Sequence, residues 1–339
     1  QLLELFTYDK AIIAEGMSYL ETIRWSYLFF VISVILMETL RAVEIVRISL
    51  YVAIIGLIAN FGINFVLIFG RFGFPEMGIR GAGIGTLTAR ALELSAVLIF
   101  LWKKGGALKL RLISFFHIDR VLLKDFVRVT YPLLIVSTLW GLSTAAQTMI
   151  LGHLDSIAIA ANSAANALYL TLKVAMLGAC ATASIMIGKA IGQGKLNVVK
   201  DYAQTLQLIF IVLGLILGAA IYLLRGPFLQ LYTLSPQTMA MCYDFLLILS
   251  ITGVGTSYQM PTNGGIISGG GDTRFIMFLD IISIWGIVLP ISALGAFAWN
   301  WSPVAVMIAL NSDQVFKCVP AFIKVHSYTW IKKLTRAEA

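Results

Sequence analysis

Three charged residues stand inside long apolar stretches of the sequence, where a charge is costly to bury. They are Glu93, Lys173 and Asp280. If these stretches lie in a lipid bilayer, a charge at its centre costs at least about 2.5–3.5 kcal/mol, so each one requires a partner or a purpose. Groups that gain or lose charge in such a place are suited to coupling with H+ or Na+. We therefore take these three residues as candidate ion-coupling groups.

Asp280 and Lys173 have no oppositely charged neighbour one helical turn away. Asp280 is either an interfacial residue that reaches lipid headgroups or Arg274, or a side chain that faces a cavity and binds a cation. Lys173 either pairs with another helix, through Glu93 or Asp280, or is a fixed positive charge in a cavity wall that is displaced or neutralised.

Glu93 and the other embedded charges have a partner on their own helix. The pairs are Glu21 with Arg24, Glu38 with Arg41, Arg90 with Glu93, and Asp313 with Lys317. Residues three or four apart share a helix face and can neutralise each other. The spacing predicts four same-helix ion pairs, with a structural role.

Uncharged polar and aromatic residues supply a second set of candidates, for lining a cavity. They are Trp140, Gln147, Asn162, Asn166, Tyr169 and Tyr258. The amides offer hydrogen bonds, and the aromatic rings can hold cationic ligands through cation–π contact. The alternative for each is hydrogen bonding and packing between helices in lipid.

Soluble enzyme chemistry finds no support in the motifs. The run from Gly188 to Lys195 has the wrong glycine spacing for a phosphate loop, and Leu196 replaces the required Ser or Thr. The three histidines and three cysteines are too dispersed for a metal site or a CxxC motif. We expect no catalytic residue, no metal and no cofactor other than a coupling ion.

Composition indicates the elements that must position these residues. Of the 339 residues, 59% are hydrophobic and 12% are charged, against about 25% charged in a soluble domain. Long apolar runs predict membrane-spanning helices. We predict an all-α polytopic membrane protein with nine spans, at 17–40, 48–69, 83–102, 128–151, 158–187, 203–224, 240–266, 276–298 and 304–325.

Basic residues set the predicted orientation. The net charge of +8 does not indicate a nucleic-acid partner, because Lys and Arg lie between the apolar runs. Most flank one set of connections, which includes 103–128 and the C-terminus; the other set holds only Lys10, Arg24, Arg71, Arg80 and Arg225. The positive-inside rule then places the C-terminus in the cytoplasm.

Two stretches of the chain repeat one layout, which predicts an internal symmetry. Tyr19 to Pro75 and Tyr243 to Pro303 each hold a span, a short charged turn, another span, a Gly/Pro loop and a third span. Three spans precede the second unit and none precedes the first, so we expect about three further helices before Gln1. The predicted domains are 1–106 (three helices of an N-terminal lobe), 107–127 (a cytoplasmic linker) and 128–339 (a six-helix C-terminal lobe with a cytoplasmic tail).

Several short motifs follow one another in an order typical of one transporter family. They are Gly70-Arg71-Phe72-Gly73-Phe74-Pro75-Glu76-Met77-Gly78-Ile79-Arg80-Gly81-Ala82, then Thr86, Arg90 and Glu93, Gly152-His153-Leu154, Ala160-Ala161-Asn162, Ile191-Gly192-Gln193-Gly194, Gly269-Gly270-Gly271-Asp272-Thr273, Trp285 with Pro290, and Trp330-Ile331-Lys332. Together they resemble the multidrug and toxic compound extrusion (MATE) family, bacterial type, over nearly the whole chain.

This resemblance implies twelve helices in two lobes around a cavity, of which the chain holds about nine. It further implies a monomeric antiporter of the cell membrane that exports drugs or toxic, often cationic, small molecules in exchange for H+ or Na+. Two positions depart from the family pattern: Val136-Ser137 stands where Asn-Glu is common, and Ile267-Ser268 where Leu-Arg is common. A lipid-linked saccharide flippase of related architecture and a non-transporting membrane remnant are the alternatives.

Overall fold

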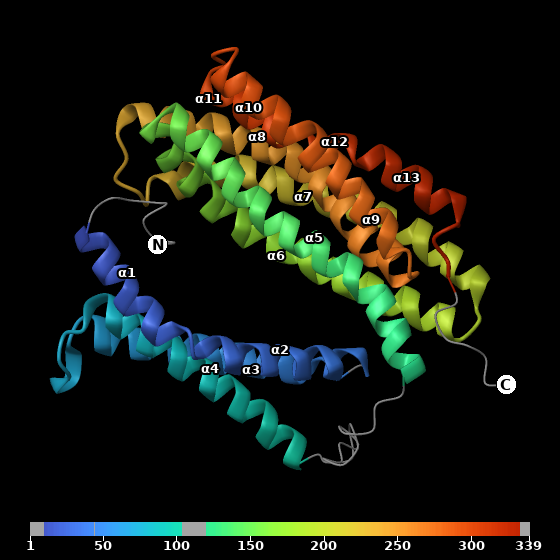
Figure 1. The fold of residues 1–339 in the computed structure, drawn as a ribbon, viewed down its shortest axis with the longest axis horizontal. Helices are drawn as coiled ribbons and strands as arrows, with labels where there is room; N and C mark the ends of the chain where they lie inside the picture. The colour runs from blue at the N-terminus through green and yellow to red at the C-terminus, as the bar shows by residue number, and fades with distance from the viewer. Residues whose placement is uncertain (1–9, 44, 104–119, 333–339) are drawn as a thin grey trace. The chain divides into compact units, whose positions relative to one another are not determined.

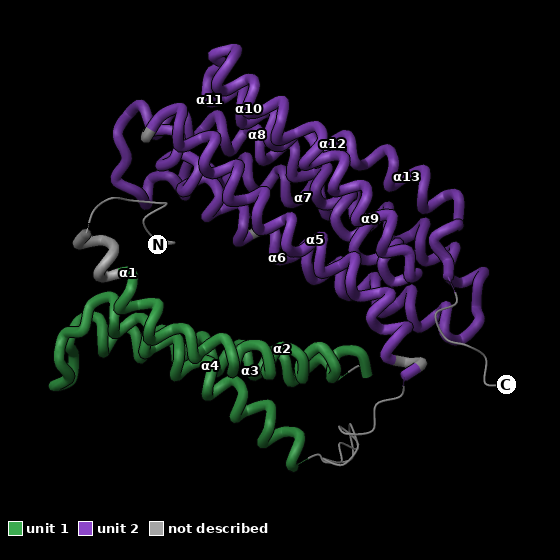
Figure 2. The backbone as a smooth tube through the Cα atoms, viewed as in Figure 1, with its two compact units in different colours: residues 1–117 green, residues 118–339 purple. Residues whose placement is uncertain are grey.

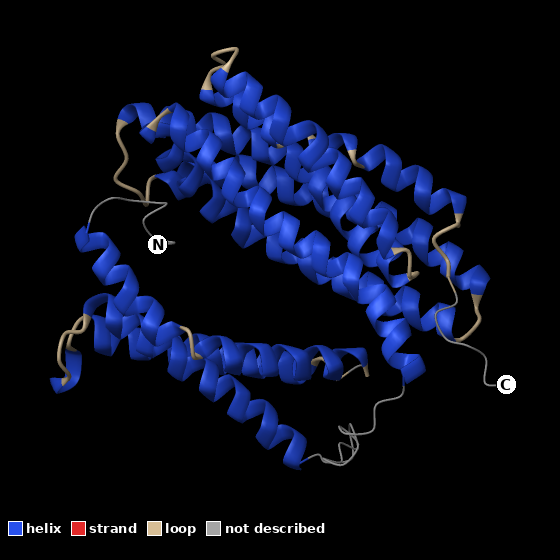
Figure 3. Ribbon diagram, in the orientation of Figure 1, coloured by secondary structure: helices blue, strands red, loops and turns tan. Residues whose placement is uncertain are grey.

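The computed structural model describes residues 10–43, 45–103 and 120–332, and over these ranges the regular structure is entirely helical (Figures 1 and 3). An α-helix satisfies its own backbone hydrogen bonds, which is the requirement for crossing lipid. The all-α membrane fold predicted from composition is confirmed.

The chain divides into two compact units, residues 1–117 and 118–339 (Figure 2). In unit 1, α4 (Gly78–Lys103) packs against each of the other three long helices. The helices that pack on it are α1 (Lys10–Ile23), α2 (Ser26–Ala42) and α3 (Arg47–Ile68), and the short 3-10 helix η2 (Arg71–Gly73) follows α3.

Unit 2 is built around α8 (Pro236–Pro261), which packs against α6 and α7 over much of its length. The other elements of unit 2 are α5 (Arg120–Leu154), α6 (Ser156–Gly192), α7 (Leu196–Leu229), η4 (Thr262–Ile267), α9 (Thr273–Asp280), η5 (Ile281–Val288), α10 (Leu289–Phe297), α11 (Pro303–Leu310), α12 (Asp313–Phe316) and α13 (Cys318–Ser327). Phe245, Leu246 and Leu249 of α8 are buried in the apolar core of this unit.

The number of spans agrees with the prediction. Within the described ranges eight helices are long and apolar enough to cross a membrane, or nine if the bent pair Gly16–Ile23 and Ser26–Ala42 forms one span. That pair meets at 45°, on either side of Arg24 and Trp25. The first predicted span, 17–40, is thus a bent pair rather than one straight helix.

The largest boundary difference is at the start of α5. Residues 120–127 were predicted to belong to the linker 107–127, but they are the first two turns of a helix that continues to Leu154. The rest of the predicted linker, 107–119, lies outside the described residues.

Two wide helical turns accompany prolines, as expected from proline's missing N–H. Pro261 ends α8 and is followed by the π-helix η4, and the π-helix η5 ends at Val288, two residues before Pro290. A π turn accommodates a local break in the α-helical hydrogen bonding without ending the span. Pro132, in contrast, lies inside α5.

A clamp of five residues joins the C-terminal tail to the turn before α9. Asp272 accepts hydrogen bonds from Lys324 at 2.8 Å and Lys332 at 2.6 Å. Trp330 is fully buried beside Gly270, and the Lys332 backbone N–H donates to the Gly270 carbonyl at 2.9 Å.

The electrostatics of the clamp follow from its hydrogen bonds. Burial by itself raises the pKa of the Asp272 carboxyl, but hydrogen bonds from Lys324 and Lys332 reverse this and hold the pKa below its ordinary value of 3.8. A carboxyl whose pKa is depressed by folding stabilises the fold above its unfolded pKa, and this stabilisation is lost as the pH falls through the folded pKa.

Gly270→Ala is expected to destabilise unit 2. A Cβ atom at this position would overlap the Trp330 ring, so the tail must shift. Overpacking of this kind costs about 1–3 kcal/mol, measurable as a lower melting temperature in detergent. Gly178→Ala is the matched control, since a Cβ there meets no atom within 4 Å; equal losses in both variants would contradict the clamp.

Asp272→Asn is expected to lower the free energy of unfolding by about 1.5–3 kcal/mol near neutral pH, because hydrogen bonds to a charged group are lost. The difference in free energy of unfolding between the two chains should shrink as the pH falls below 3.8. In this range the Asp272 carboxyl of the unmodified chain also becomes protonated. Melting temperatures measured against pH test this, with the exposed Asp201→Asn as control. A difference that is independent of pH would rule out the charged clamp.

Candidate functional site

A three-charge cluster lies inside unit 2, where α9 meets α12 and α13. The Lys317 ammonium lies 2.7 Å from a carboxylate oxygen of Asp280 and 3.0 Å from one of Asp313. The side chains of Lys317 and Asp313 are 3% and 4% exposed, and that of Asp280 is 22% exposed. Asp280 is therefore the member through which a small ion would reach the cluster.

The cluster revises the interpretation of Asp280. It pairs neither with Arg274 nor with Lys173, as two of the predicted alternatives required, but with Lys317, which lies between α12 and α13. Two carboxylates and one ammonium leave one uncompensated negative charge when all three are ionised. A buried unpaired charge is strongly unfavourable.

A row of side-chain amides leads to the Asp313 carboxylate. Asn263 donates to Gln259 at 3.1 Å, Gln259 to Gln314 at 2.9 Å, and Gln314 to Asp313 at 2.8 Å. Every donor in this row points toward the carboxylate, so the row stabilises its negative charge. The buried Oδ1 of Asn263, at the far end, accepts no hydrogen bond from the described part of the chain.

A second branch connects the cluster to α6. The Tyr169 hydroxyl donates to Thr256 at 3.0 Å. The Thr256 hydroxyl lies 2.9 Å from the Gln314 side-chain oxygen, which also accepts the hydrogen bond from Gln259. Tyr169 is buried, with 7% of its surface exposed. The hydrogen-bonded network therefore runs from the middle of α6 through α8 to the charged residues of α12 and α13.

Lys173 lies next to this network, one turn beyond Tyr169 on α6. Its ammonium nitrogen is 5.7 Å from the centre of the Trp140 ring and 5.6 Å from that of Tyr169, within the range of cation–π attraction. In the described part of the chain it forms no ion pair, although Asp313 attracts it at longer range. Of the alternatives predicted for Lys173, the pair with Asp280 does not form, because Asp280 pairs with Lys317.

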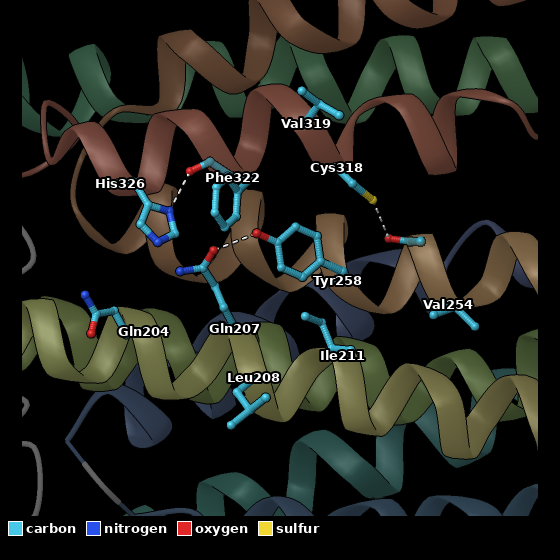
Figure 4. Close-up of a pocket in the computed structure, with 11 residues that line it drawn as sticks. Gln204, Gln207, Leu208, Ile211, Val254, Tyr258, Cys318, Val319, Phe322 and His326 are labelled. Atoms are coloured by element: carbon cyan, nitrogen blue, oxygen red, sulfur yellow. Dashed lines mark hydrogen bonds between the residues drawn. The ribbon is translucent and has the colours of Figure 1, made fainter.

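The remaining cavity candidates divide between two places. Asn162 and Asn166 share a face of α6 with Tyr169 and Lys173, and Asn166 donates to Asn162 at 2.8 Å. Gln147 is half-buried on α5, two turns from Trp140. Tyr258 lies apart: it is two residues from Thr256 on α8, so it faces α7, where its hydroxyl donates to Gln207 at 2.6 Å (Figure 4).

Unit 1 contains a separate polar cluster. Arg90 and Glu93 form the predicted pair at 2.7 Å, and Glu93 is buried against Gly56, where any side chain would overlap the carboxylate. The guanidinium of Arg90 lies 4.6 Å from the centre of the Phe30 ring. Glu93 thus has a charge partner and a tightly shaped environment, which favours a structural role.

Sequence reasoning missed a row of polar contacts in the same unit. Asn64 donates to Asn60 at 3.1 Å, and Asn60 donates to Thr86 at 3.4 Å. The four-residue spacing of Asn60 and Asn64, the same as that of Asn162 and Asn166, was the available signal.

Three of the four predicted same-helix pairs form. Glu38 with Arg41, Arg90 with Glu93, and Asp313 with Lys317 are within 3.0 Å. In the fourth, Arg24 does not pair with Glu21 but places its guanidinium 5.4 Å from the centre of the Trp25 ring. Over the described residues, no three His, Cys, Asp or Glu side chains are grouped as a metal site would require.

Comparison with known proteins identifies the family of the chain. The family model MatE matches residues 1–66 and 132–294. The chain is 25% identical over 312 residues to the "Probable multidrug resistance protein NorM" of Xylella fastidiosa, and 26% identical over 259 residues to that of Halalkalibacterium halodurans. These alignments span 91% and 76% of this chain, and 66% and 56% of those proteins.

Solved structures share the fold at low sequence identity. The eukaryotic MATE transporter AtDTX14 superposes with a TM-score of 0.85 at 16% identity, over 98% of this chain and 73% of that one. The Vibrio cholerae MATE transporter VcmN in its bent form gives a TM-score of 0.76 at 16% identity, over 96% and 72%. The family model covers well over half of the sequence, and the chain therefore belongs to the MatE family of multi-pass membrane transporters.

Proposed function

We propose that the protein exports small, often cationic, compounds by antiport, and that the Asp280–Lys317–Asp313 cluster couples export to the inward movement of H+. The observation that carries this proposal is a membrane-embedded cluster with one negative charge in excess, in a chain of the MatE family. The relatives of this chain are named as multidrug resistance proteins, which supports the substrate class.

The geometry favours H+ over Na+. The Lys317 ammonium already occupies the position between the two carboxylates that a metal ion would take, at 2.7 and 3.0 Å. A proton needs no such space, since it binds one Asp280 oxygen directly. Its arrival neutralises Asp280, weakens the contact with Lys317 and leaves Lys317 paired with Asp313 alone.

Lys173 marks the proposed substrate position. Its ammonium lies near two aromatic faces, those of Trp140 and Tyr169, which are equally suited to a cationic ligand. A bound cation would replace Lys173 at these rings. Tyr169 is hydrogen-bonded to the network that reaches Asp313. This exchange would therefore alter the hydrogen bonds that lead to the coupling cluster.

Two other functions make different demands on these residues. A flippase for lipid-linked saccharides has an anionic substrate and needs a basic cavity, and the second embedded lysine, Lys317, is already neutralised by carboxylates. A non-transporting remnant would retain the fold without gradient-driven movement of any compound. We further propose a cell-membrane location, a cytoplasmic C-terminus and a monomeric state.

Asp280→Asn is expected to abolish the dependence of ethidium efflux on an imposed pH gradient, because the amide cannot bind and release the proton. The measurement uses the chain in liposomes, with pH and Na+ gradients imposed separately. Asp244→Asn is the control, since Asp244 is exposed and forms no ion pair in the described structure. A melting temperature within the range of the control shows that the fold is retained.

The outcomes separate the alternatives. Efflux by the unmodified chain that follows only a Na+ gradient would reject the proton proposal. Efflux by Asp280→Asn that still responds to pH would remove the cluster from the mechanism. Absence of any ethidium efflux from the unmodified chain, with the fold intact, would support the non-transporting alternative, and movement of a lipid-linked saccharide would support the flippase.

Trp140→Leu is expected to weaken ethidium binding about 2- to 30-fold, because a desolvated cation–π contact contributes about 0.5–2 kcal/mol. Fluorescence titration in detergent measures this. Trp102→Leu is the control, because Trp102 is 83% exposed and lies in unit 1. Equal affinity in the two variants would show that the ligand binds elsewhere.

A further inference from the structure

A groove of about 540 Å3 runs along unit 2 between α7 and α13, with α8 as its floor (Figure 4). Leu208, Val319 and Phe322 form its apolar walls, and each is more than half exposed. A second groove, of about 590 Å3, continues beyond Val254 and Gly255, which line both. In a membrane-spanning unit, exposed apolar walls of this kind are surfaces for lipid.

The length of the first groove matches one leaflet of a bilayer. It extends along α13 from His326 to Cys318, about 12 Å at 1.5 Å per residue. Half of a hydrocarbon core is about 15 Å thick. The groove therefore has room for one acyl chain that enters from the end near the C-terminal tail.

Polar groups gather at that end of the first groove. Further along, Gln207 and Tyr258 also line it, but they are hydrogen-bonded to each other at 2.6 Å. Gln204 and His326 lie at the mouth, as Figure 4 shows, and the Gln204 amide donates to the Tyr328 hydroxyl at 3.2 Å. Lys200, one turn before Gln204, has its ammonium 5.1 Å from the centre of the Tyr328 ring. His326 uses Nδ1 for the Phe322 carbonyl, at 2.9 Å, which directs Nε2 away from the helix.

The charge balance at the mouth is positive. Lys324, the next nearest lysine on α13, is neutralised by Asp272 at 2.8 Å. Lys200 forms no ion pair in the described part of the chain, and Asp201 projects from a different face of α7, about 100° away. An ammonium and an amide at the end of an apolar groove match the phosphate of a lipid headgroup.

We infer that this groove is a binding site for an anionic glycerophospholipid. One acyl chain lies along α8 between Leu208 and Phe322, and the phosphate is held by Lys200 and Gln204. The positive mouth disfavours a cationic amphiphile, and the groove is separate from the cluster of Asp280, Asp313 and Lys317.

Lipid binding by the purified chain tests the site. Phosphatidylglycerol and phosphatidylcholine with the same acyl chains are titrated against the protein in detergent, and bound lipid is counted by native mass spectrometry. Lys200→Gln should weaken phosphatidylglycerol binding about fivefold, the effect of one positive charge near an anionic lipid, and leave phosphatidylcholine unchanged. Val319→Trp, which fills the groove, should weaken both.

Matched controls exclude a general lipid annulus. Lys195→Gln removes another exposed lysine near the start of α7, and Leu223→Trp adds the same ring to an exposed position on α7 outside both grooves. Neither control should change binding. Equal effects of Lys200→Gln and Lys195→Gln, equal effects of the two tryptophan variants, or equal affinity for the two lipids in the unmodified chain would each overturn the proposal.

Discussion

Neutralisation of buried charge is the constraint on which the interior of unit 2 depends. Lys317 is almost fully enclosed, and removing water from an ammonium costs several kcal/mol unless carboxylates surround it. Asp280 and Asp313 meet that requirement only if α9 and α12 approach α13 closely. The amide row from Asn263 through Gln259 and Gln314 ends in a second donor to the Asp313 oxygen that faces Lys317, and it links α8 to the cluster.

The sequence predicts whatever depends on local spacing. Apolar length gave the spans, and intervals of three or four residues gave three ion pairs, because both are properties of one helix. The contact between Asp280 and Lys317 was not predictable, since these residues are 37 apart and meet only after the spans are packed. The hydrogen bond between Tyr169 and Thr256 was not predictable for the same reason, because it depends on how α6 and α8 are rotated against each other.

The two sides of α8 carry different environments. Thr256 faces the polar network, and Tyr258, two residues later, faces the apolar groove beside α7. A helix that turns about 100° per residue separates such neighbours onto nearly opposite faces. Aromatic type alone therefore could not distinguish Tyr169, which lies next to Lys173, from Tyr258, which lines a lipid-facing surface.

Asp272 and Asp280 stand at the two ends of α9, and each binds a lysine of the chain segment that forms α13, Lys324 and Lys317 respectively. Two ion pairs, about 12 Å apart along α9, therefore connect these two antiparallel segments. If the Asp280–Lys317 contact is lost while the Asp272–Lys324 contact remains, α13 can pivot about its end near the tail but cannot slide along α9. Loss of this single contact would then produce an angular displacement of α13, largest at its end near Lys317.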